Sequence, residues 1–461
     1  MPSLSFLRNK TVAVMGLGKS GTASVHALQD SGAVVWAWDD SKEARQAGEA
    51  AGVDLVDLYQ ADLSSVGLMV WSPGIAHTHP KPHPVAERAR AKGISLVCDV
   101  ELLARCNPAT RMIAVTGTNG KSTTTSLIHH ILATAGVTAA AGGNLGTPAL
   151  DLPILERSGS YVLELSSYQL ELLDQAGFDV AVLLNISADH LSRHGGMDGY
   201  VAAKASLFKR LRPGGVAVVG VDDEASRKIL ETCRENGTAI AISAQQPVQG
   251  GVSGHSGVLI DDCDGRNRPM IDLRLLPHLP GRHNWQNACA AYAAARASGI
   301  DVATICAGLE SYPGLAHRQE QVAELKGIRF INDSKATNAD AAEKALLCYN
   351  EIYWLAGGQA KEGGIAALSP LFGRIRKAFL IGEASEAFAA TLSGKAAFER
   401  CGTLDVAVSR AFETALADGH PEAVVLLSPA CASWDQFNSF EHRGQIFRQL
   451  VQRLAKSEGA G

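Results

Sequence analysis

A short apolar run breaks into a glycine-rich turn in residues 112–123, MIAVTGTNGKST. The run ends at Val115, the turn begins at Gly117, and residues 124–135 have helical character. A strand, a glycine turn and a helix in this order present backbone amides and a helix N-terminus to an anion. The segment therefore predicts an α/β domain with a phosphate-binding loop.

The side chains of this turn suit a nucleoside triphosphate. Lys121 is placed to reach the β- and γ-phosphates, and the Ser122 hydroxyl is placed to bind magnesium. The full pattern G-x-x-x-x-G-K-[ST] is not met, because residue 115 is Val where the pattern has Gly. The plainer alternative is a glycine turn with a solvent-exposed lysine. We favour a triphosphate site made by Gly117, Thr118, Asn119, Gly120, Lys121, Ser122 and Thr123.

Similar apolar runs recur along the chain and indicate its fold class. They are continuous rather than alternating, and helix-length segments usually separate them, which is typical of buried parallel strands in βαβ units. Examples are Thr11–Met15, Val34–Trp38, Leu68–Trp71, Tyr161–Leu165, Val180–Leu184, Ile352–Leu355 and Ala378–Ile381. The 461 residues suggest about three domains at about 150 residues each. With breaks at residues 106–110 and 311–315, we predict an α/β protein with domains 1–107, 108–311 and 312–461.

Composition narrows the class of protein. Hydrophobic residues make up 46% and charged residues 19% of the chain, which fits a globular protein. The net charge of −5 argues against a nucleic-acid partner. The nine cysteines are scattered, as expected of reduced thiols in a cytoplasmic protein. We see no signal peptide and no apolar stretch of the ~18 residues that a membrane helix needs, so we expect no membrane insertion.

A second glycine motif, Gly16-Leu17-Gly18-Lys19-Ser20-Gly21, follows the first apolar run. It matches G-x-G-x-x-G, and Asp39 and Asp40 follow the next run, where a dinucleotide site has its ribose-binding carboxylate. The motif alone leaves three alternatives open: a nicotinamide cofactor, another nucleotide or phosphate, or close packing of the backbone.

Polar residues at two further run ends are candidate metal ligands. Glu164 ends the run at residues 161–165, and Asn185-Ile186-Ser187-Ala188-Asp189-His190 follows the run at 180–184. Oxygen ligands with one imidazole beside a triphosphate suit magnesium. His190 and His194 also have zinc-like spacing, but no obvious third ligand lies nearby. The alternative for each residue is a polar cap on a loop.

Taken together, these motifs resemble the ATP-dependent Mur ligases of bacterial cell-wall synthesis. The resemblance rests on GTNGKST (117–123), LELSSYQL (163–170) and NISADH (185–190); folylpolyglutamate synthetases share a related core. Four further segments, GLGKSG (16–21), SPGI (72–75), NDSKATN (332–338) and SPACASWDQF (428–437), resemble the branch of the family that adds D-glutamate. The resemblance implies a Rossmann-like N-terminal domain, a central P-loop ATPase domain and a Rossmann-like C-terminal domain.

The resemblance also implies a reaction. Members of this branch join D-glutamate to UDP-N-acetylmuramoyl-L-alanine through an acyl phosphate and a tetrahedral intermediate, in cytoplasmic peptidoglycan precursor synthesis. It implies ATP and two magnesium ions, and it reassigns the N-terminal glycine loop from NAD to the uridine diphosphate of the substrate. We expect the protein to be a monomer. A Rossmann dehydrogenase and a P-loop nucleotide switch are the competing interpretations. The first leaves both the loop at 117–123 and the segment at 332–338 unexplained.

Site residues follow from the resemblance position by position. Catalytic and metal-binding roles are implied for Lys121, Ser122, Glu164, His190 and Lys204, the last as a carbamate, although spacing alone describes Lys204 as an ordinary helical lysine. ATP contacts are implied for Asn284, Asn287, Arg318 and Asp333. The UDP substrate is assigned to Lys19, Ser20, Asp39, Asp40, Ser72, Gly74, Asn144 and Ser166, and D-glutamate to Lys335, Thr337, Lys361, Ser433 and Phe440. Ser41 and Lys42 stand where many relatives have arginine or asparagine, which bears on the uracil contacts.

Overall fold

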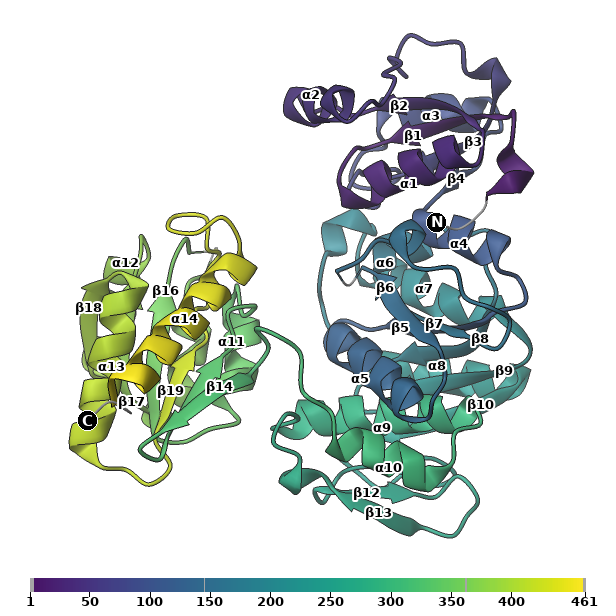
Figure 1. Ribbon diagram of the computed structural model, residues 1–461. Coiled ribbons are helices and arrows are strands. Elements are labelled where there is room, and N and C mark those ends of the chain that lie inside the picture. The colour runs from purple at the N-terminus through teal and green to yellow at the C-terminus, as the bar shows by residue number, and fades with distance from the viewer. Residues whose placement is uncertain (1–3, 145, 361–362, 459–461) are drawn as a thin grey trace. The chain divides into compact units, whose positions relative to one another are not determined.

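Three β-sheets, each flanked by helices, organise the computed structural model (Figure 1). It describes residues 4–144, 146–360 and 363–458. The predicted α/β class with mostly parallel sheets is confirmed. All nine cysteines are free thiols.

The N-terminal sheet has four parallel strands in the order β2-β1-β3-β4. Its strands are β1 (Thr11–Met15), β2 (Val34–Trp38), β3 (Val66–Trp71) and β4 (Leu96–Val97), and its helices are α1 (Lys19–Asp30), α2 (Lys42–Ala50), α3 (Pro84–Ala91) and α4 (Asp99–Cys106). Strands β1 and β2 match the predicted runs; β1 is buried along most of its length, whereas β2 lies at the sheet edge and is mostly only partly buried.

The central sheet has nine strands in the order β13-β12-β11-β10-β9-β8-β5-β7-β6. They are β5 (Arg111–Thr116), β6 (Ala139–Gly143), β7 (Ser160–Glu164), β8 (Phe178–Leu183), β9 (Leu211–Gly220), β10 (Thr238–Ser243), β11 (Val252–Ser253), β12 (Val258–Asp261) and β13 (Arg268–Asp272). The helices are α5 (Lys121–Thr134), α6 (Ser167–Leu170), α7 (Met197–Ala205), α8 (Glu224–Asn236), α9 (Arg282–Ala297) and α10 (Val302–Glu310). The antiparallel pairings among these strands are those of β12 with β11 and of β13 with β12.

The C-terminal sheet has six strands in the order β14-β15-β19-β16-β17-β18, with β14 antiparallel to β15. The strands are β14 (Glu320–Leu325), β15 (Ile328–Asn332), β16 (Ile352–Gly357), β17 (Ile375–Ile381), β18 (Phe398–Gly402) and β19 (Val424–Leu427). The helices are α11 (Ala339–Leu346), α12 (Ser385–Leu392), α13 (Leu404–Asp418) and α14 (Phe440–Glu458). The segments 332–338 and 428–437 follow β15 and β19, which are neighbours in the sheet.

By density of internal contacts the chain forms two compact units. One contains residues 1–273 and 284–312, and the other contains residues 274–283 and 313–461. The first unit therefore holds the N-terminal and central sheets, and the second holds the C-terminal sheet. The boundaries at 107/108 and 311/312 stay a prediction.

Candidate active site

The loop after β5 has a backbone that only glycine accommodates. Gly117 and Gly120 have φ angles of +152° and +87°. A Cβ atom on Gly120 would stand 2.2 Å from the Asn287 side-chain oxygen. Glycine at 120 is therefore required both by the left-handed backbone and by the close approach of Asn287. Helix α5 begins at the next residue, so its N-terminus faces the mouth of the loop.

Lys121 curls back over this loop. Its Nζ donates hydrogen bonds to the carbonyls of Gly117, at 3.0 Å, and Thr118, at 2.8 Å. Ser122 is buried in the first turn of α5. The ammonium and the helix N-terminus thus place positive charge at one point, which suits the phosphates of a nucleotide.

Two asparagines predicted for ATP, on α9, lie against the loop. Thr124 on α5 donates a hydrogen bond to the Asn287 oxygen at 3.3 Å, and the Asn287 amide donates to the Asn284 oxygen at 3.0 Å. Both asparagines are buried. Thr124 and Asn287, 163 residues apart in the chain, are thereby joined beside the loop at residues 117–123, which we call the phosphate loop.

Hydrogen bonds that sequence reasoning did not predict fix the other side of the loop, and one of their residues, Asn185, had been a candidate metal ligand instead. Asn185 accepts a hydrogen bond from the Asn119 backbone at 2.9 Å and donates to Gln286 at 2.8 Å. The Thr118 hydroxyl lies 3.1 Å from the Tyr200 hydroxyl. Asn185 opens the segment NISADH, so its position at the end of β8 was the available signal; Gln286 and Tyr200 carried none.

Glu164 stands beside the loop with one oxygen unused. It pairs in register with Val115, two residues before Gly117, and only 3% of it is exposed. Its Oε1 accepts a hydrogen bond from the Asn144 side chain at 2.7 Å, whereas the buried Oε2 has no partner among the described residues. A buried carboxylate oxygen without a donor fits a cation ligand. Asn144, predicted to contact the UDP substrate, here orients Glu164.

Lys204 is a buried amine next to the same loop, in contrast to the surface lysine that spacing alone describes. It is 1% exposed, and its Nζ donates to the Gly117 carbonyl at 2.9 Å and lies 4.7 Å from the centre of the Tyr200 ring. Burial, and after it the charge of Lys121, lower the pKa of Lys204 to about 7. A fraction of this amine is therefore uncharged and nucleophilic at neutral pH.

The two histidines with zinc-like spacing have different surroundings. His190 has a left-handed backbone and a side chain that is 54% exposed, 3.5 Å from Asp189. His194 is buried and uses both ring nitrogens, on Glu171 at 2.7 Å and on Ser167 at 2.9 Å. Across the described ranges, no three His, Cys, Asp or Glu side chains form a metal-binding group. The zinc interpretation thus has no support, and the structure does not bring Glu164 and His190 into one such group.

The side chain of Asp39 binds the backbone of the N-terminal glycine loop, residues 16–21. A Cβ on Gly16 would stand 2.4 Å from the Ser72 Cβ, so the loops after β1 and β3 meet closely at this point. Asp39 accepts hydrogen bonds from the backbone of Leu17, at 2.6 Å, and of Ser41, at 2.8 Å. Its two oxygens thus stabilise the loop itself.

The other residues assigned to the UDP substrate are divided between the N-terminal and central domains. Lys19 and Ser20 begin α1. Asp40 accepts a hydrogen bond from the Tyr59 hydroxyl at 2.9 Å and lies 2.8 Å from His83 Nε2. Ser166, in the central domain, caps α6 by accepting from the Gln169 backbone at 3.2 Å. Tyr59 and His83 were missed, because nothing local links them to Asp40.

In the second unit, Asp333 is a buried carboxyl with a raised pKa. Burial raises its pKa to about 7, against the opposing effect of a hydrogen bond from Ser428 at 2.8 Å. The Gln319 backbone donates to its other oxygen at 3.2 Å. Arg318 belongs to the same unit, and its positive charge also favours the ionised form of Asp333.

The residues predicted for D-glutamate lie on or beside the two loops that follow β15 and β19. Lys335 Nζ stands 3.8 Å from the centre of the Phe440 ring, and Ser433 is 2% exposed. Thr337 donates its backbone N–H to the Lys335 carbonyl at 2.8 Å. Lys361 lies outside the described residues.

Arg443 on α14, missed by sequence reasoning, fastens these two loops together. It is fully buried and donates to the Ser334 hydroxyl at 2.9 Å and carbonyl at 2.8 Å, and to the Cys431 carbonyl at 3.1 Å. Burial lowers the pKa of Arg443 to about 10, so the guanidinium remains charged at neutral pH. A long-range contact of this kind leaves no local pattern in the sequence.

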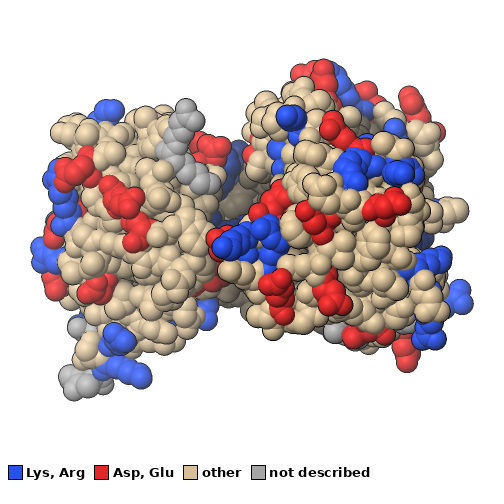
Figure 2. Space-filling model, turned by 90° about the horizontal axis from the view of Figure 1, so that it is seen from above, with Lys and Arg blue, Asp and Glu red and all other residues tan. Residues whose placement is uncertain are grey.

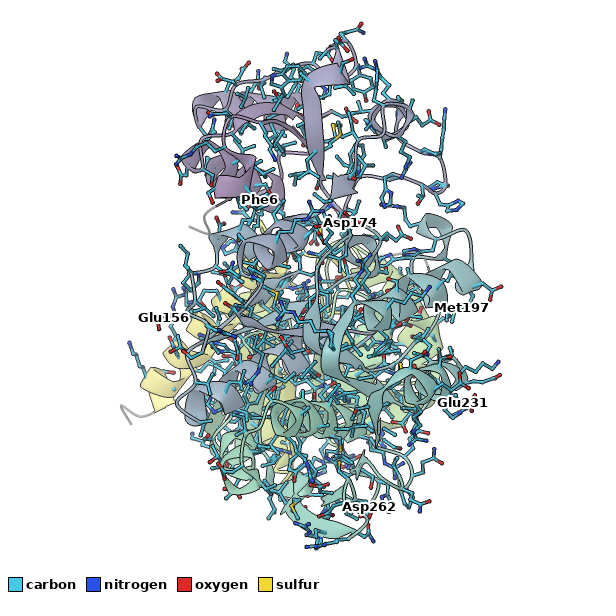
Figure 3. The ribbon with its side chains drawn as sticks, turned by 90° about the vertical axis from the view of Figure 1, so that its right-hand side faces the viewer. Phe6, Glu156, Asp174, Met197, Glu231 and Asp262 are labelled. Atoms are coloured by element: carbon cyan, nitrogen blue, oxygen red, sulfur yellow. The ribbon has the colours of Figure 1, made fainter. Side chains whose placement is uncertain are left out.

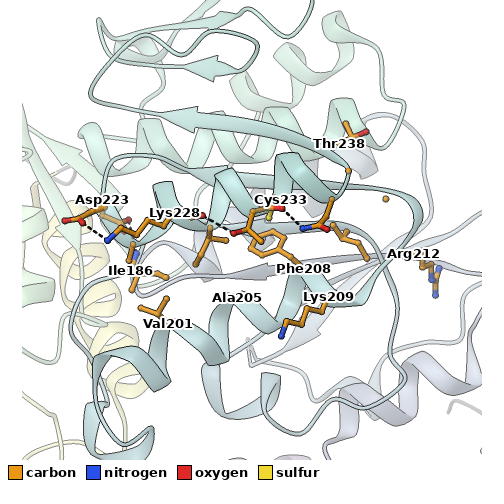
Figure 4. Close-up of a pocket in the computed structure, with 18 of the residues that line it drawn as sticks. Ile186, Val201, Ala205, Phe208, Lys209, Arg212, Asp223, Lys228, Cys233 and Thr238 are labelled. Carbon is orange, nitrogen blue, oxygen red and sulfur yellow. Dashed lines mark hydrogen bonds and ion pairs between the residues drawn. The ribbon is translucent and has the colours of Figure 1, made fainter.

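A groove of about 1260 Å³ lies between α7 and α8 (Figure 4). Apolar side chains such as Val201, Phe208 and Ile229 line it, and Lys228 and Asp223 lie at one end in this view. Lys204 is not among its lining residues although neighbours on α7 are. The groove thus lies on another face of α7 from the candidate active site.

Charged side chains of both signs are interspersed over the face shown in Figure 2. Across residues 4–144, 146–360 and 363–458, no helix combines the length and the apolar character needed to cross a bilayer.

Known proteins are similar to this chain over nearly its full length. The profile of the Mur ligase middle domain matches residues 115–295. A UDP-N-acetylmuramoylalanine–D-glutamate ligase of Paramagnetospirillum magneticum is 60% identical over 100% of both chains. One of Rhodospirillum rubrum is 55% identical over 97% of this chain and 96% of its own. A UDP-N-acetylmuramate-alanine ligase structure from Thermotoga maritima has a TM-score of 0.59 at 16% identity, covering 97% of this chain and 99% of that one, which supports the fold alone.

Proposed function

The chain belongs to the Mur ligase family, and on this premise we propose that it joins D-glutamate to UDP-N-acetylmuramoyl-L-alanine with consumption of ATP, as the names of its full-length relatives indicate for them. The observation that carries the proposal is the identity of 60% over the whole length of both chains. The loop at 117–123, with Glu164 and Lys204 buried beside it, supplies the chemistry that such a ligase needs.

ATP is proposed to bind at the loop after β5. Lys121 and the N-terminus of α5 neutralise the phosphates, and Asn284 and Asn287 lie beside the loop. Arg318 and Asp333 are proposed as further ATP contacts. The pKa of about 7 for Asp333 leaves its carboxyl able to donate or to accept a hydrogen bond near neutral pH.

Residues at the loop fit magnesium. The buried, unpartnered Oε2 of Glu164 is an oxygen ligand in need of a cation, and Ser122 is buried in the first turn of α5. We infer that Ser122, Glu164, His190 and a carbamate on Lys204 hold two magnesium ions. Bound magnesium would offset the negative charge of the triphosphate and of the substrate carboxylate.

The carbamate on Lys204 is proposed from the state of this amine. With its pKa lowered to about 7, the unprotonated amine attacks CO₂, an N–C bond forms, one proton is released, and an anionic carbamate remains. The modification replaces a buried cation next to Lys121 by an anion. It therefore removes a repulsion and supplies an oxygen ligand.

The reaction is proposed to proceed in two steps. A carboxylate oxygen of the acceptor attacks the γ-phosphorus of ATP, and ADP leaves. The D-glutamate amine then attacks the acyl carbon and loses a proton, and the tetrahedral intermediate collapses with release of phosphate. The protein positions the reactants and offsets their negative charges, through Lys121 in the first unit and Lys335 in the second.

We propose the remaining assignments on the same basis. The N-terminal glycine loop takes the uridine diphosphate and not NAD, and the loops after β15 and β19 take D-glutamate through Lys335, Thr337, Lys361, Ser433 and Phe440. The protein is proposed to act as a cytoplasmic monomer on small molecules, without a nucleic-acid partner. The domain boundaries at 107/108 and 311/312 belong to this proposal.

Phosphate release tests the proposed function. It is expected to require ATP, D-glutamate and UDP-N-acetylmuramoyl-L-alanine together, with no change in NADH absorbance. A panel of D- and L-amino acids in the same assay identifies the nucleophile. Phosphate release that is unchanged when either substrate is omitted would contradict the assignment.

A further inference from the structure

Glu171, the residue after α6, bridges two imidazoles from different domains of the first unit. His77, in the loop after β3, has its Nε2 3.2 Å from Glu171 Oε2. His194, in the segment before α7, has its Nδ1 2.7 Å from Glu171 Oε1. Both imidazoles are buried, and the Glu171 side chain is only 23% exposed. We call these three residues the Glu171 bridge.

The partners of the two imidazoles fix the direction of the hydrogen bonds. Arg90 Nη2 lies 2.9 Å from His77 Nδ1, and a guanidinium only donates, so Nδ1 is the acceptor and the proton is on Nε2, facing Glu171. Glu171 Oε1 only accepts, so His194 Nδ1 carries the proton that faces it, and His194 Nε2 lies 2.9 Å from the Ser167 hydroxyl. His194 therefore donates a hydrogen bond to Oε1, whereas His77 Nε2 contacts Oε2 at 3.2 Å without making a hydrogen bond. Burial raises the pKa of Glu171, but the two histidines together outweigh it and lower that pKa below its usual value, so the carboxylate is ionised at neutral pH.

The N-terminal side of the Glu171 bridge is the loop assigned to the UDP substrate. His77 follows Ser72 and Gly74 in the same loop. Arg193, next to His194, donates to the carbonyls of Gly74 at 2.9 Å and Pro73 at 3.3 Å. Arg193 of the central domain thus binds this loop directly, and His194 is linked to it through Glu171.

The central side of the Glu171 bridge continues to the phosphate loop. Tyr168 stacks on His194 with ring centres 5.5 Å apart at 21°, and the Tyr200 ring centre lies 5.4 Å from that of His194. The Tyr200 hydroxyl contacts Thr118 at 3.1 Å, and its ring contacts Lys204. A continuous chain of contacts therefore joins the substrate loop to the loop proposed to bind ATP.

We propose that Glu171 is a positioning residue that holds the loop 73–77 of the N-terminal domain against the central domain, so that a bound acceptor presents its carboxylate to the phosphate loop. The proposal rests on the proposed function and adds a residue that neither touches the reacting atoms nor belongs to a motif of the sequence. Alignment across two domains requires such a fastening, because small displacements of reacting groups cost large factors in rate.

Amide hydrogen exchange on the protein without ligands tests the contact itself. Glu171→Ala is expected to raise exchange in the loop 73–83, where the backbone N–H groups of Ile75 and His83 are bonded within the loop. Glu156→Gln is the matched control, since Glu156 is exposed and lies on the opposite side of the central domain from Met197, where α7 begins (Figure 3). Unchanged exchange in Glu171→Ala, or an equal rise in the control, overturns the proposal. This experiment does not depend on catalysis, so its result can be interpreted even if the proposed function is wrong.

Steady-state kinetics test what the contact does. Glu171→Ala and His77→Ala are each expected to raise the KM for the acceptor by roughly tenfold while the KM for ATP stays unchanged, and the double variant is expected to be no worse than either single one. Glu171→Gln, which keeps one acceptor oxygen, is expected to lie between wild type and Glu171→Ala. Additive effects of the two alanine changes, or equal rises in the KM for ATP and for the acceptor, overturn the positioning role. A wild-type protein that releases no phosphate would instead contradict the proposed function.

Discussion

Gly120→Ala tests how the phosphate loop is built. The change puts a Cβ on a residue whose φ is +87°, 2.2 Å from the Asn287 oxygen and 3.1 Å from a Leu184 methyl group. The change lowers the free energy of unfolding in two ways, through the strained backbone and through the close contact with Asn287. Gly136, just past the other end of α5, has a φ of +73°, and a Cβ added there would meet no atom within 4 Å, so Gly136→Ala carries the first cost alone.

The two costs can be estimated separately. A non-glycine residue in the left-handed region costs about 1–2 kcal/mol. Asn287 is 2% exposed, so it cannot move away without losing hydrogen bonds to Thr124 or Asn284, which adds about 1–2 kcal/mol. For a domain of about 200 residues, each kcal/mol lowers the Tm by about 2–4 °C. We expect a Tm about 5–10 °C below wild type for Gly120→Ala and about 3–5 °C below for Gly136→Ala.

Thermal unfolding and the KM for ATP together decide the outcome. Gly120→Ala is expected to raise the KM for ATP by at least about tenfold, because Asn287 and the loop amides move, whereas Gly136→Ala leaves it unchanged. Because Gly120→Ala already displaces the Asn287 side chain, Asn287→Ala should lower the Tm less in the Gly120→Ala background than in the wild-type protein. Equal Tm losses for the two glycine changes, with an unchanged KM for ATP in both, would refute the reasoning.

Three other predictions concern carboxylates and the buried lysine. Glu164→Gln keeps a hydrogen-bonding side chain beside Asn144 but removes the charge, so we expect an unchanged Tm and phosphate release reduced by at least about a hundredfold; activity near wild type would contradict a metal-binding role. Lys204→Ala is expected to lose activity and to recover part of it with added short carboxylates, and full activity without them would exclude the carbamate. Glu101 accepts hydrogen bonds from the backbone of residues 174–176 and from Arg105, which together outweigh burial and lower its pKa from 4.5. Its stabilising effect is therefore present above pH 4.5 and lost as the pH falls through the lowered value, so thermal unfolding of Glu101→Gln should show a lower Tm than wild type at about pH 7 and a smaller difference at about pH 3.

Sequence patterns predicted the parts of this protein in which one physical cause acts locally. Strand β1 is apolar and almost fully buried, and the edge strand β2 is apolar although mostly only partly buried, so the bounds of both could be read directly from their apolar runs. Strands β12 and β13 were not predicted, since at this edge of the sheet much of their surface is only partly buried and β13 contains charged residues. The glycine turn at 117–120 was predicted because backbone geometry restricts the residue type there.

Interactions between distant residues were not predictable in this way. Spacing made Lys204 an ordinary helical lysine, whereas its burial and lowered pKa come from the packing of α7 against the phosphate loop. His194 was considered as a zinc ligand because of its spacing from His190. Its partners in the structure, Glu171 and Ser167, lie 23 and 27 residues away in the chain and leave no local pattern. Resemblance to a family supplied a proposed role for Lys204, but it supplied none for Glu171.

The place of Arg443 in the chain bears on what a C-terminal truncation would remove. The strands of the C-terminal sheet all precede α14, and Arg443, which fastens the two loops, lies on α14. A chain that stops before α14 would therefore keep the residues that pair β15 with β19, while the loops after these strands would lack their common anchor.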